Sequence, residues 1–183
     1  MFAMMPGHAI GQGLQPILGY NYGAKRFGNA VRAVSYAMAS GTAFCLVFFA
    51  VFMAFPDRIT QIFTTNEEIL ATSVHAVRIV FLALPMMGFL MVGSLVFQSI
   101  GRPVQSFITS ISRPVLFLIP LMCILPRFMG IEGVWLTFPL ADSMTAVLTF
   151  ILLAPVMRSF RESRTSPKHV PNEQIYKQLD FQE

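Results

Sequence analysis

Charged residues are scarce in this 183-residue chain, and long stretches contain none. Asp, Glu, Lys and Arg make up 12% of the sequence, whereas soluble domains carry about a quarter. No charged residue lies between Arg32 and Asp57 or between Arg78 and Arg102. As helix, at about 1.5 Å per residue, such stretches cross the hydrocarbon core of a bilayer, which is about 30 Å thick. The composition therefore excludes an ordinary soluble domain.

Cysteine is also scarce, since Cys45 and Cys123 are the only two in the sequence. Both lie inside apolar stretches, and their spacing matches neither a metal site nor a disulfide framework. We interpret them as small residues of the helix packing. We therefore expect no metal and no other cofactor bound by this chain.

A nucleic-acid surface is missing as well. The net charge of +4 and the isoelectric point of about 9.4 would suggest nucleic-acid binding in a soluble protein. Here the basic residues lie between and after the apolar stretches, where positive charge sets the orientation of a membrane protein. No cluster of Lys and Arg with interleaved aromatic residues is present. We expect no nucleic-acid partner.

The apolar stretches also lack the strict alternation of barrel strands and the polar face of a soluble helix. Only helices and closed barrels satisfy all of their backbone hydrogen bonds in lipid. The sequence, which is 55% hydrophobic, therefore predicts an all-α polytopic membrane protein.

Five transmembrane helices are predicted within a bundle over residues 1–157, and residues 158–183 are predicted to form a polar tail. The fourth span must begin before residue 114, because residues 114–126 alone are too short to cross the bilayer. Prolines predict bending points in three of the spans, at Pro16, Pro85 and Pro120. The five predicted spans are approximately 1–20, 33–55, 79–100, 106–126 and 134–156.

The basic residues predict the orientation of these spans. They concentrate in two loops and at the start of the tail, and this excess favours the cytoplasmic side. The tail is therefore expected in the cytoplasm and the chain in a plasma membrane, the inner membrane of a bacterium. An extracytoplasmic start suggests that a segment upstream is missing. The residues concerned are Lys25, Arg26, Arg32, Arg102, Arg158, Arg161 and Arg164.

Several short motifs resemble the multidrug and toxic compound extrusion (MATE) family of transporters. The segment GQGLQPILGYNYGA at 11–24 resembles the end of the second helix of the family's C-terminal lobe. LALP at 82–85 and FQSIGR at 97–102 resemble the tenth span and its exit. IPL at 119–121, GVW at 133–135 and PLAD at 139–142 resemble spans eleven and twelve. The resemblance covers the chain to about residue 158, in the family's order.

The resemblance implies a fold and a function. The family has twelve helices in two six-helix lobes, so this chain would supply about spans eight to twelve, most of the C-terminal lobe. It would be part of an antiporter, driven by H⁺ or Na⁺, that exports amphipathic and often cationic compounds by alternating access. The implied partners are these small compounds, membrane lipids, and the missing N-terminal lobe or a complementary chain.

Asp142 is the most informative polar residue, because an ionised carboxylate inside a span costs about 2.5–3.5 kcal/mol. It is either a proton- or cation-sensitive group on a cavity wall or a structural acid bonded to a neighbour such as Ser143 or Thr145. Arg113 also falls inside a span. It either extends its head to the cytoplasmic surface or pairs with an acid such as Asp142.

Gln15 and Gln98 are the uncharged polar residues that we place on the pathway of substrate or ion. Hydrogen bonding between helices is the alternative role for both. Some branches of the family carry a coupling carboxylate in the tenth span, but residues 79–100 contain no acid. The coupling ion is therefore expected to bind mainly outside this chain.

Other functions were weighed against transport. A flippase for lipid-linked precursors, of related architecture, needs a strongly cationic cavity, and Arg113 is the one basic residue that we place deep in a span. A fragment that does not transport remains a further alternative. An enzyme is not expected, because Asp142, His8 and the two cysteines lie on separate spans without the clustering that catalysis requires.

Overall fold

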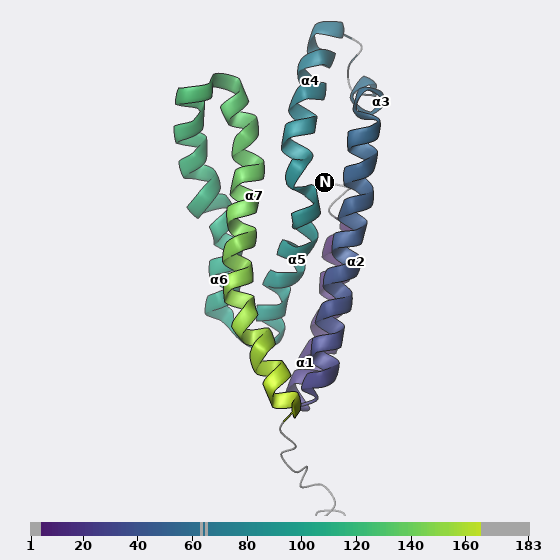
Figure 1. The fold of residues 1–183 in the computed structure, drawn as a ribbon, viewed down its shortest axis with the longest axis vertical. Helices are drawn as coiled ribbons and strands as arrows, with labels where there is room; N and C mark the ends of the chain where they lie inside the picture. The colour runs from purple at the N-terminus through teal and green to yellow at the C-terminus, as the bar shows by residue number, and fades with distance from the viewer. Residues whose placement is uncertain (1–4, 63, 65, 166–183) are drawn as a thin grey trace, which may run out of the picture.

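The computed structural model describes residues 5–62, 64 and 66–165, and its regular structure there is entirely helical (Figure 1). Two pairs of helices are continuous through short irregular turns: α4 runs through η2 into α5, and α6 runs through η3 into α7. The all-α prediction is confirmed. The elements are α1 (Met5–Gly23), α2 (Phe27–Ala54), α3 (Pro56–Gln61), α4 (Glu67–Val80), η2 (Phe81–Ala83), α5 (Leu84–Ser99), α6 (Pro103–Ile111), η3 (Ser112–Leu118) and α7 (Ile119–Thr165).

The long helix α7 is two antiparallel arms joined by a sharp turn at Gly130, which has φ 58° and ψ −136°. The two arms are visible in Figure 1 as a hairpin at the upper end. Glycine is suited to this turn because other residues rarely adopt a positive φ. Just beyond the turn, a Cβ on Gly133 would lie 2.6 Å from the Leu125 carbonyl oxygen. A second glycine therefore lets the arms approach closely.

Three helical stretches are long and apolar enough to cross a membrane: Phe27–Ala54, Ile69–Ser99 and Pro103–Ser163. The third makes two passes, because it reverses at Gly130. The helix α1 falls outside this set and packs mainly against α2 and α5. The predicted tail begins at residue 158, but α7 continues as helix to Thr165, and residues 166–183 lie outside the described residues.

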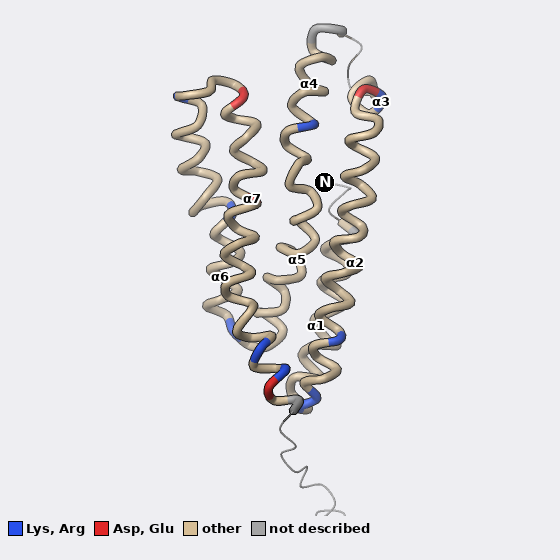
Figure 2. The backbone as a smooth tube through the Cα atoms, viewed as in Figure 1, with Lys and Arg blue, Asp and Glu red and all other residues tan. Residues whose placement is uncertain are grey.

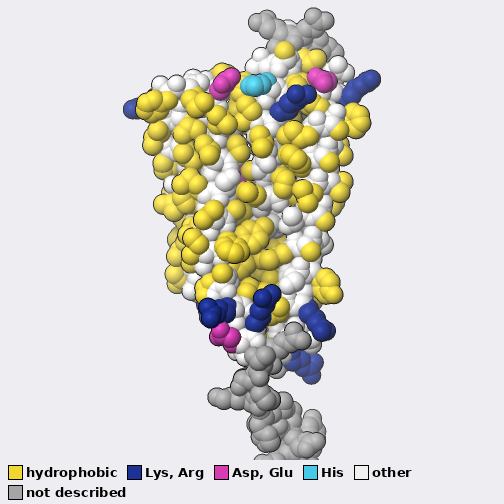
Figure 3. Space-filling model, in the orientation of Figure 1, with side chains coloured by type: hydrophobic (Ala, Val, Ile, Leu, Met, Phe, Trp, Pro, Cys, Tyr) yellow, Lys and Arg dark blue, Asp and Glu magenta, His cyan; other side chains and the backbone are white. Residues whose placement is uncertain are grey.

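The distribution of charge matches the membrane prediction. Charged residues lie mostly at the two ends of the bundle (Figure 2). Hydrophobic side chains cover the wall between these ends (Figure 3). Large apolar residues such as Phe107 and Phe150 are 65% and 63% exposed on the protein surface. Water would penalise so much exposed apolar area, whereas lipid does not.

The main core lies where α1, α2, α5 and the second arm of α7 meet. Aliphatic side chains from all four helices pack there, and Phe97 is fully buried among them. Such close packing, rather than a hydrophobic driving force, holds helices together in lipid. Its largest fully buried side chains are Leu18, Val34, Val92, Val96, Phe97 and Val156.

The three prolines predicted as bending points lie in helices of different local geometry. Pro85 lies in the first turn of α5, directly after the 3₁₀ turn η2. Pro120 follows η3, a π-helical segment that also contains Pro114. Proline lacks the N–H that a regular α-helix needs, and both irregular segments accommodate that loss. Pro16, in contrast, lies inside α1, which continues to Gly23.

The helices α2 and α5 cross closely at Gly41 and Gly88. A Cβ on Gly88 would lie 2.5 Å from the backbone carbon and oxygen of Gly41 and 2.6 Å from the Thr42 nitrogen. Backbone atoms cannot move aside as a flexible side chain can. The crossing therefore requires glycine at position 88.

We predict that Gly88→Ala destabilises the bundle by about 1–3 kcal/mol, because the added methyl group forces the two backbones apart. Gly13→Ala is the matched control, since a Cβ there meets nothing within 4 Å. Thermal unfolding of the purified chain in detergent should show a lower Tm for Gly88→Ala and no loss for the control. Equal Tm values for the two variants would contradict the requirement for glycine at position 88.

Candidate functional site

The four residues predicted to lie on the pathway come together as two pairs in the structure. Gln15 on α1 bonds Gln98 on α5. Arg113 in η3 bonds Asp142 on the second arm of α7. Each pair joins two different helices. Within an apolar bundle, such contacts let polar side chains satisfy one another.

The glutamine pair depends on a stripe of small residues on α1. Gly7 and Gly11 precede Gln15 at intervals of four residues, so all three share one helix face. A Cβ on Gly11 would lie 2.2 Å from the Leu95 side chain. The G-x-x-x-G step at Gly7 and Gly11 thus brings α1 close to α5. At this separation, Gln15 Nε2 donates to Gln98 Oε1 over 2.9 Å.

A second polar contact, which the sequence reasoning missed, continues this arrangement. Ser94 Oγ lies 3.0 Å from Ser110 Oγ. Ser94 is one helical turn before Gln98, so both lie on the same side of α5. The four-residue spacing of Ser94 and Gln98 could have indicated a shared polar face of α5. Nothing in the sequence indicated that Ser110 is the partner of Ser94. This side of α5 is thereby bonded to α1 through Gln98 and to α6 through Ser94.

A groove of about 430 Å³ opens next to these contacts, where α5 ends and α6 begins. We call it the α6 groove. Its size falls within the roughly 300–1,000 Å³ that is typical of small-molecule sites. Gln98 therefore contacts both a neighbouring helix and an open space. The groove is lined by Gln98, Gly101, Pro103, Ser106, Phe107 and Ser110.

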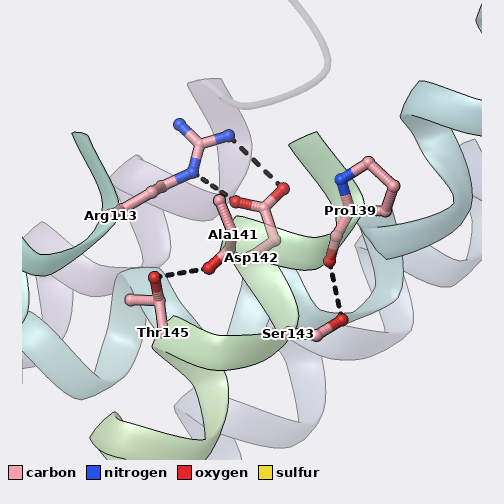
Figure 4. Close-up of polar contacts among 6 residues, drawn as sticks. All are labelled: Arg113, Pro139, Ala141, Asp142, Ser143 and Thr145. Carbon is pink, nitrogen blue, oxygen red and sulfur yellow. Dashed lines mark hydrogen bonds and ion pairs between the residues drawn. The ribbon is translucent and has the colours of Figure 1, made fainter. Parts of the chain in front are cut away.

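The ion pair lies in the interior of the bundle, away from the ends of the helices that carry it. Arg113 Nε donates to Asp142 Oδ1, and Arg113 Nη2 donates to Asp142 Oδ2 over 3.4 Å (Figure 4). The side chain of Asp142 is 3% exposed and that of Arg113 is 37% exposed. Of the two roles weighed for Arg113, the structure shows pairing with an acid. A carboxylate within reach satisfies the guanidinium without the chain having to reach the membrane surface.

Ser143 and Thr145 were predicted as alternative partners of Asp142, and that prediction is wrong. Ser143 donates to the Pro139 carbonyl and Thr145 to the Ala141 carbonyl, each over 2.7 Å (Figure 4). A hydroxyl has a single proton, so neither can also donate to the carboxylate. Both side chains bond within their own helix, and the charge of Asp142 is compensated by Arg113.

The arrangement holds a pair of opposite charges inside the bundle. Among the described residues, no three His, Cys, Asp or Glu side chains lie together as metal ligands. A guanidinium has five N–H donors, and Asp142 uses two of those of Arg113. The others remain for a partner that approaches the exposed side of Arg113.

Comparison with known proteins assigns the chain to a family. The MatE family model matches residues 1–124, which is more than half of the chain. The chain belongs to the MATE family. The prediction from the short motifs is thus confirmed.

Individual MATE proteins are similar over most of this chain. The multidrug export protein MepA of Staphylococcus aureus (strain MSSA476) is 28% identical over 146 residues, which are 78% of this chain and 31% of MepA. The solved structure of the MATE multidrug transporter DinF-BH is 41% identical, with a TM-score of 0.80. That match covers 85% of this chain and 35% of DinF-BH.

A more distant structure supports the fold. A variant of the Vibrio cholerae MATE transporter VcmN is 22% identical, with a TM-score of 0.79, over 86% of this chain and 36% of VcmN. The chain thus spans about a third of the length of each of these MATE proteins.

We predict that removing Arg113 destabilises the protein more than removing the charge of Asp142. Arg113→Met should cost about 3–5 kcal/mol of unfolding free energy, because Asp142 is left buried without a partner. Asp142→Asn should cost less, because the freed Arg113 can extend toward the membrane surface. The double variant should cost less than the sum of the two. Unfolding in mixed detergent micelles measures all three.

Arg158→Gln is the control for this cycle. Arg158 pairs with Glu162 over 2.9 Å, but the two side chains are 82% and 67% exposed, and such pairs contribute at most about 1 kcal/mol. Strict additivity of the Arg113 and Asp142 variants would contradict a direct interaction.

Proposed function

We propose that this chain is part of a multidrug efflux antiporter, driven by H⁺ or Na⁺, that exports amphipathic and often cationic compounds by alternating access. The observation that carries the proposal is the family match over residues 1–124. Family relatives named as multidrug proteins, MepA and DinF-BH, support the substrate class. The polar pairs inside an otherwise apolar bundle supply the groups that such a pathway needs.

The antiporter would be completed by a complementary N-terminal lobe, on another chain or upstream. The chain's coverage of about a third of its relatives supports this. So does α1, on which His8 and Gln12 are exposed. Polar side chains inside a membrane normally face the interior of a bundle or a water-filled cavity. A second lobe facing α1 would provide that environment.

Within the lobe, we assign the two pairs different roles. Gln15 and Gln98 would line the substrate pathway, as uncharged polar side chains that pair between α1 and α5. Asp142 and Arg113 would hold η3 against α7 and respond to ions in the pathway, while the main coupling site lies outside this chain. We expect no cofactor in either place.

The flippase alternative is less well supported by the geometry. A pyrophosphate headgroup would need several uncompensated cations deep in the bundle. Arg113 is neutralised by Asp142. This arrangement favours drug efflux over transport of a lipid-linked precursor.

The proposed location is a bacterial inner membrane with the C-terminus in the cytoplasm. Lys and Arg gather at the end of the bundle where α7 finishes, as Figure 2 shows. An excess of basic residues on one side of the membrane favours the cytoplasmic orientation of that side.

We predict that a chimera in which this chain replaces the matching part of DinF-BH exports ethidium from cells that lack their own drug pumps. This chain alone should not, because one lobe cannot enclose a pathway between two lobes. Dye accumulation measures efflux, and collapsing the H⁺ or the Na⁺ gradient separately identifies the driving ion. Efflux by the chain alone would refute the need for a second lobe. A chimera that inserts correctly but does not export would refute the proposed function.

We further predict that Gln98→Leu lowers efflux by the chimera about fivefold, the value of roughly one lost hydrogen bond. Gln61→Leu is the matched control, because Gln61 is exposed at the end of α3, away from both pairs. Initial rates at equal expression measure the effect. Equal rates for both variants would leave Gln98 with a packing role.

A further inference from the structure

The α6 groove has a polar side and an apolar side. Gln98, Ser106 and Ser110 supply polar groups, and Phe107, which is 65% exposed, supplies an aromatic surface. No acidic residue lines the groove. Its occupant should therefore accept hydrogen bonds and also have an apolar portion.

Ser106 is the most informative residue of the groove. It is 6% exposed, yet its hydroxyl makes no hydrogen bond within residues 5–62, 64 and 66–165. Its neighbours behave differently, since the hydroxyls of Ser99 and Thr109 donate to carbonyls one turn earlier over 2.8 and 3.0 Å. Since no fully buried side-chain N or O atom among the described residues lacks a hydrogen-bond partner, the unbonded Ser106 hydroxyl is accessible rather than enclosed. The α6 groove, which Ser106 lines, is where a partner can approach it.

Further hydrogen-bond donors surround this hydroxyl. Gln98 accepts from Gln15 through its oxygen, so the amide N–H₂ of Gln98 remains available. The helix α6 begins at Pro103 without a side-chain cap from Arg102. The N–H groups at such a helix start carry partial positive charge and bind anions. A negatively charged acceptor is thus favoured over a cation.

Arg102 adds a full positive charge at the mouth of the groove. It lies between the lining residues Gly101 and Pro103, is exposed, and has no ion pair within the described part of the chain. It also falls in a loop predicted at the membrane surface. Phe107 is five residues further along α6, or about 7.5 Å deeper in the bilayer. The groove therefore offers donors at headgroup level and an aromatic ring at acyl-chain level.

We propose that the α6 groove binds one anionic phospholipid, with the phosphate at Arg102, Ser106 and the start of α6, and with an acyl chain along Phe107. The charge complementarity and the depth of the donors select a lipid phosphate. The proposal depends on membrane insertion but not on drug export, so it stands or fails independently of the proposed function.

Native mass spectrometry of the full chain in detergent tests this, with phosphatidylglycerol and phosphatidylcholine as probes. We expect tighter binding of phosphatidylglycerol. Arg102→Gln should weaken it about fivefold, the contribution of one basic residue near an anionic lipid. Ser106→Ala should weaken it about two- to tenfold, as one lost hydrogen bond would. Because the Ser106 hydroxyl has no bond within the described protein, this variant should fold normally.

Arg32→Gln is the matched control, because Arg32 is an exposed basic residue on α2 outside the groove. It should leave phosphatidylglycerol binding unchanged. Equal losses from Arg102→Gln and Arg32→Gln would overturn the proposal in favour of diffuse attraction. So would unchanged binding in Ser106→Ala, equal binding of the two lipids, or full displacement of the lipid by inorganic phosphate, which would indicate a site for a soluble anion.

Discussion

Lipid supplies no hydrogen bonds, and this constraint determines how most buried polar side chains in the bundle are arranged. Most buried hydroxyls meet it locally, by donating to a carbonyl one turn earlier in their own helix, as Thr137 and Thr145 do. Gln15, Gln98, Arg113 and Asp142 are too long or too charged for that solution. They meet it by pairing between helices. The residues that we propose for the transport pathway are therefore also those that fix which helices adjoin.

Close helix approach makes this pairing possible, and glycine makes the close approach possible. Gly11 brings α1 against Leu95, while Gly41 and Gly88 bring α2 and α5 into backbone contact. Without a hydrophobic driving force between helices, such packing supplies much of their attraction. The small residues thus set the helix separation, and that separation allows Gln15 to reach Gln98. The positions of the glycines thus determine both the close packing of the helices and the hydrogen bond between Gln15 and Gln98.

Sequence reasoning succeeded where a property belongs to a single segment. Charge-free stretches predicted the helices, and a lone acid drew attention to Asp142. It failed where two segments had to be aligned. Asp142 had three candidate partners, and only the rotation of η3 against α7 selects Arg113.

The Ser94–Ser110 contact was missed for the same reason, as was the contact between His75 and Glu132. There, His75 Nε2 lies 3.7 Å from Glu132 Oε1, and its ring lies 5.6 Å from that of Trp135. The relative rotation of helices depends on the whole bundle, and no local pattern contains it.

The ion pair has a particular consequence because of the segment that carries it. Among the described elements, η3 contacts only α6, which precedes it, and α7. It contains Pro114, and it has the wider π-helical geometry that is often found at functional sites. Its attachment to the second arm of α7 includes the Arg113–Asp142 pair, whereas α1, α2 and α5 share a continuous core. The Arg113–Asp142 pair thus fastens to α7 a segment that lies outside the core shared by α1, α2, α5 and α7.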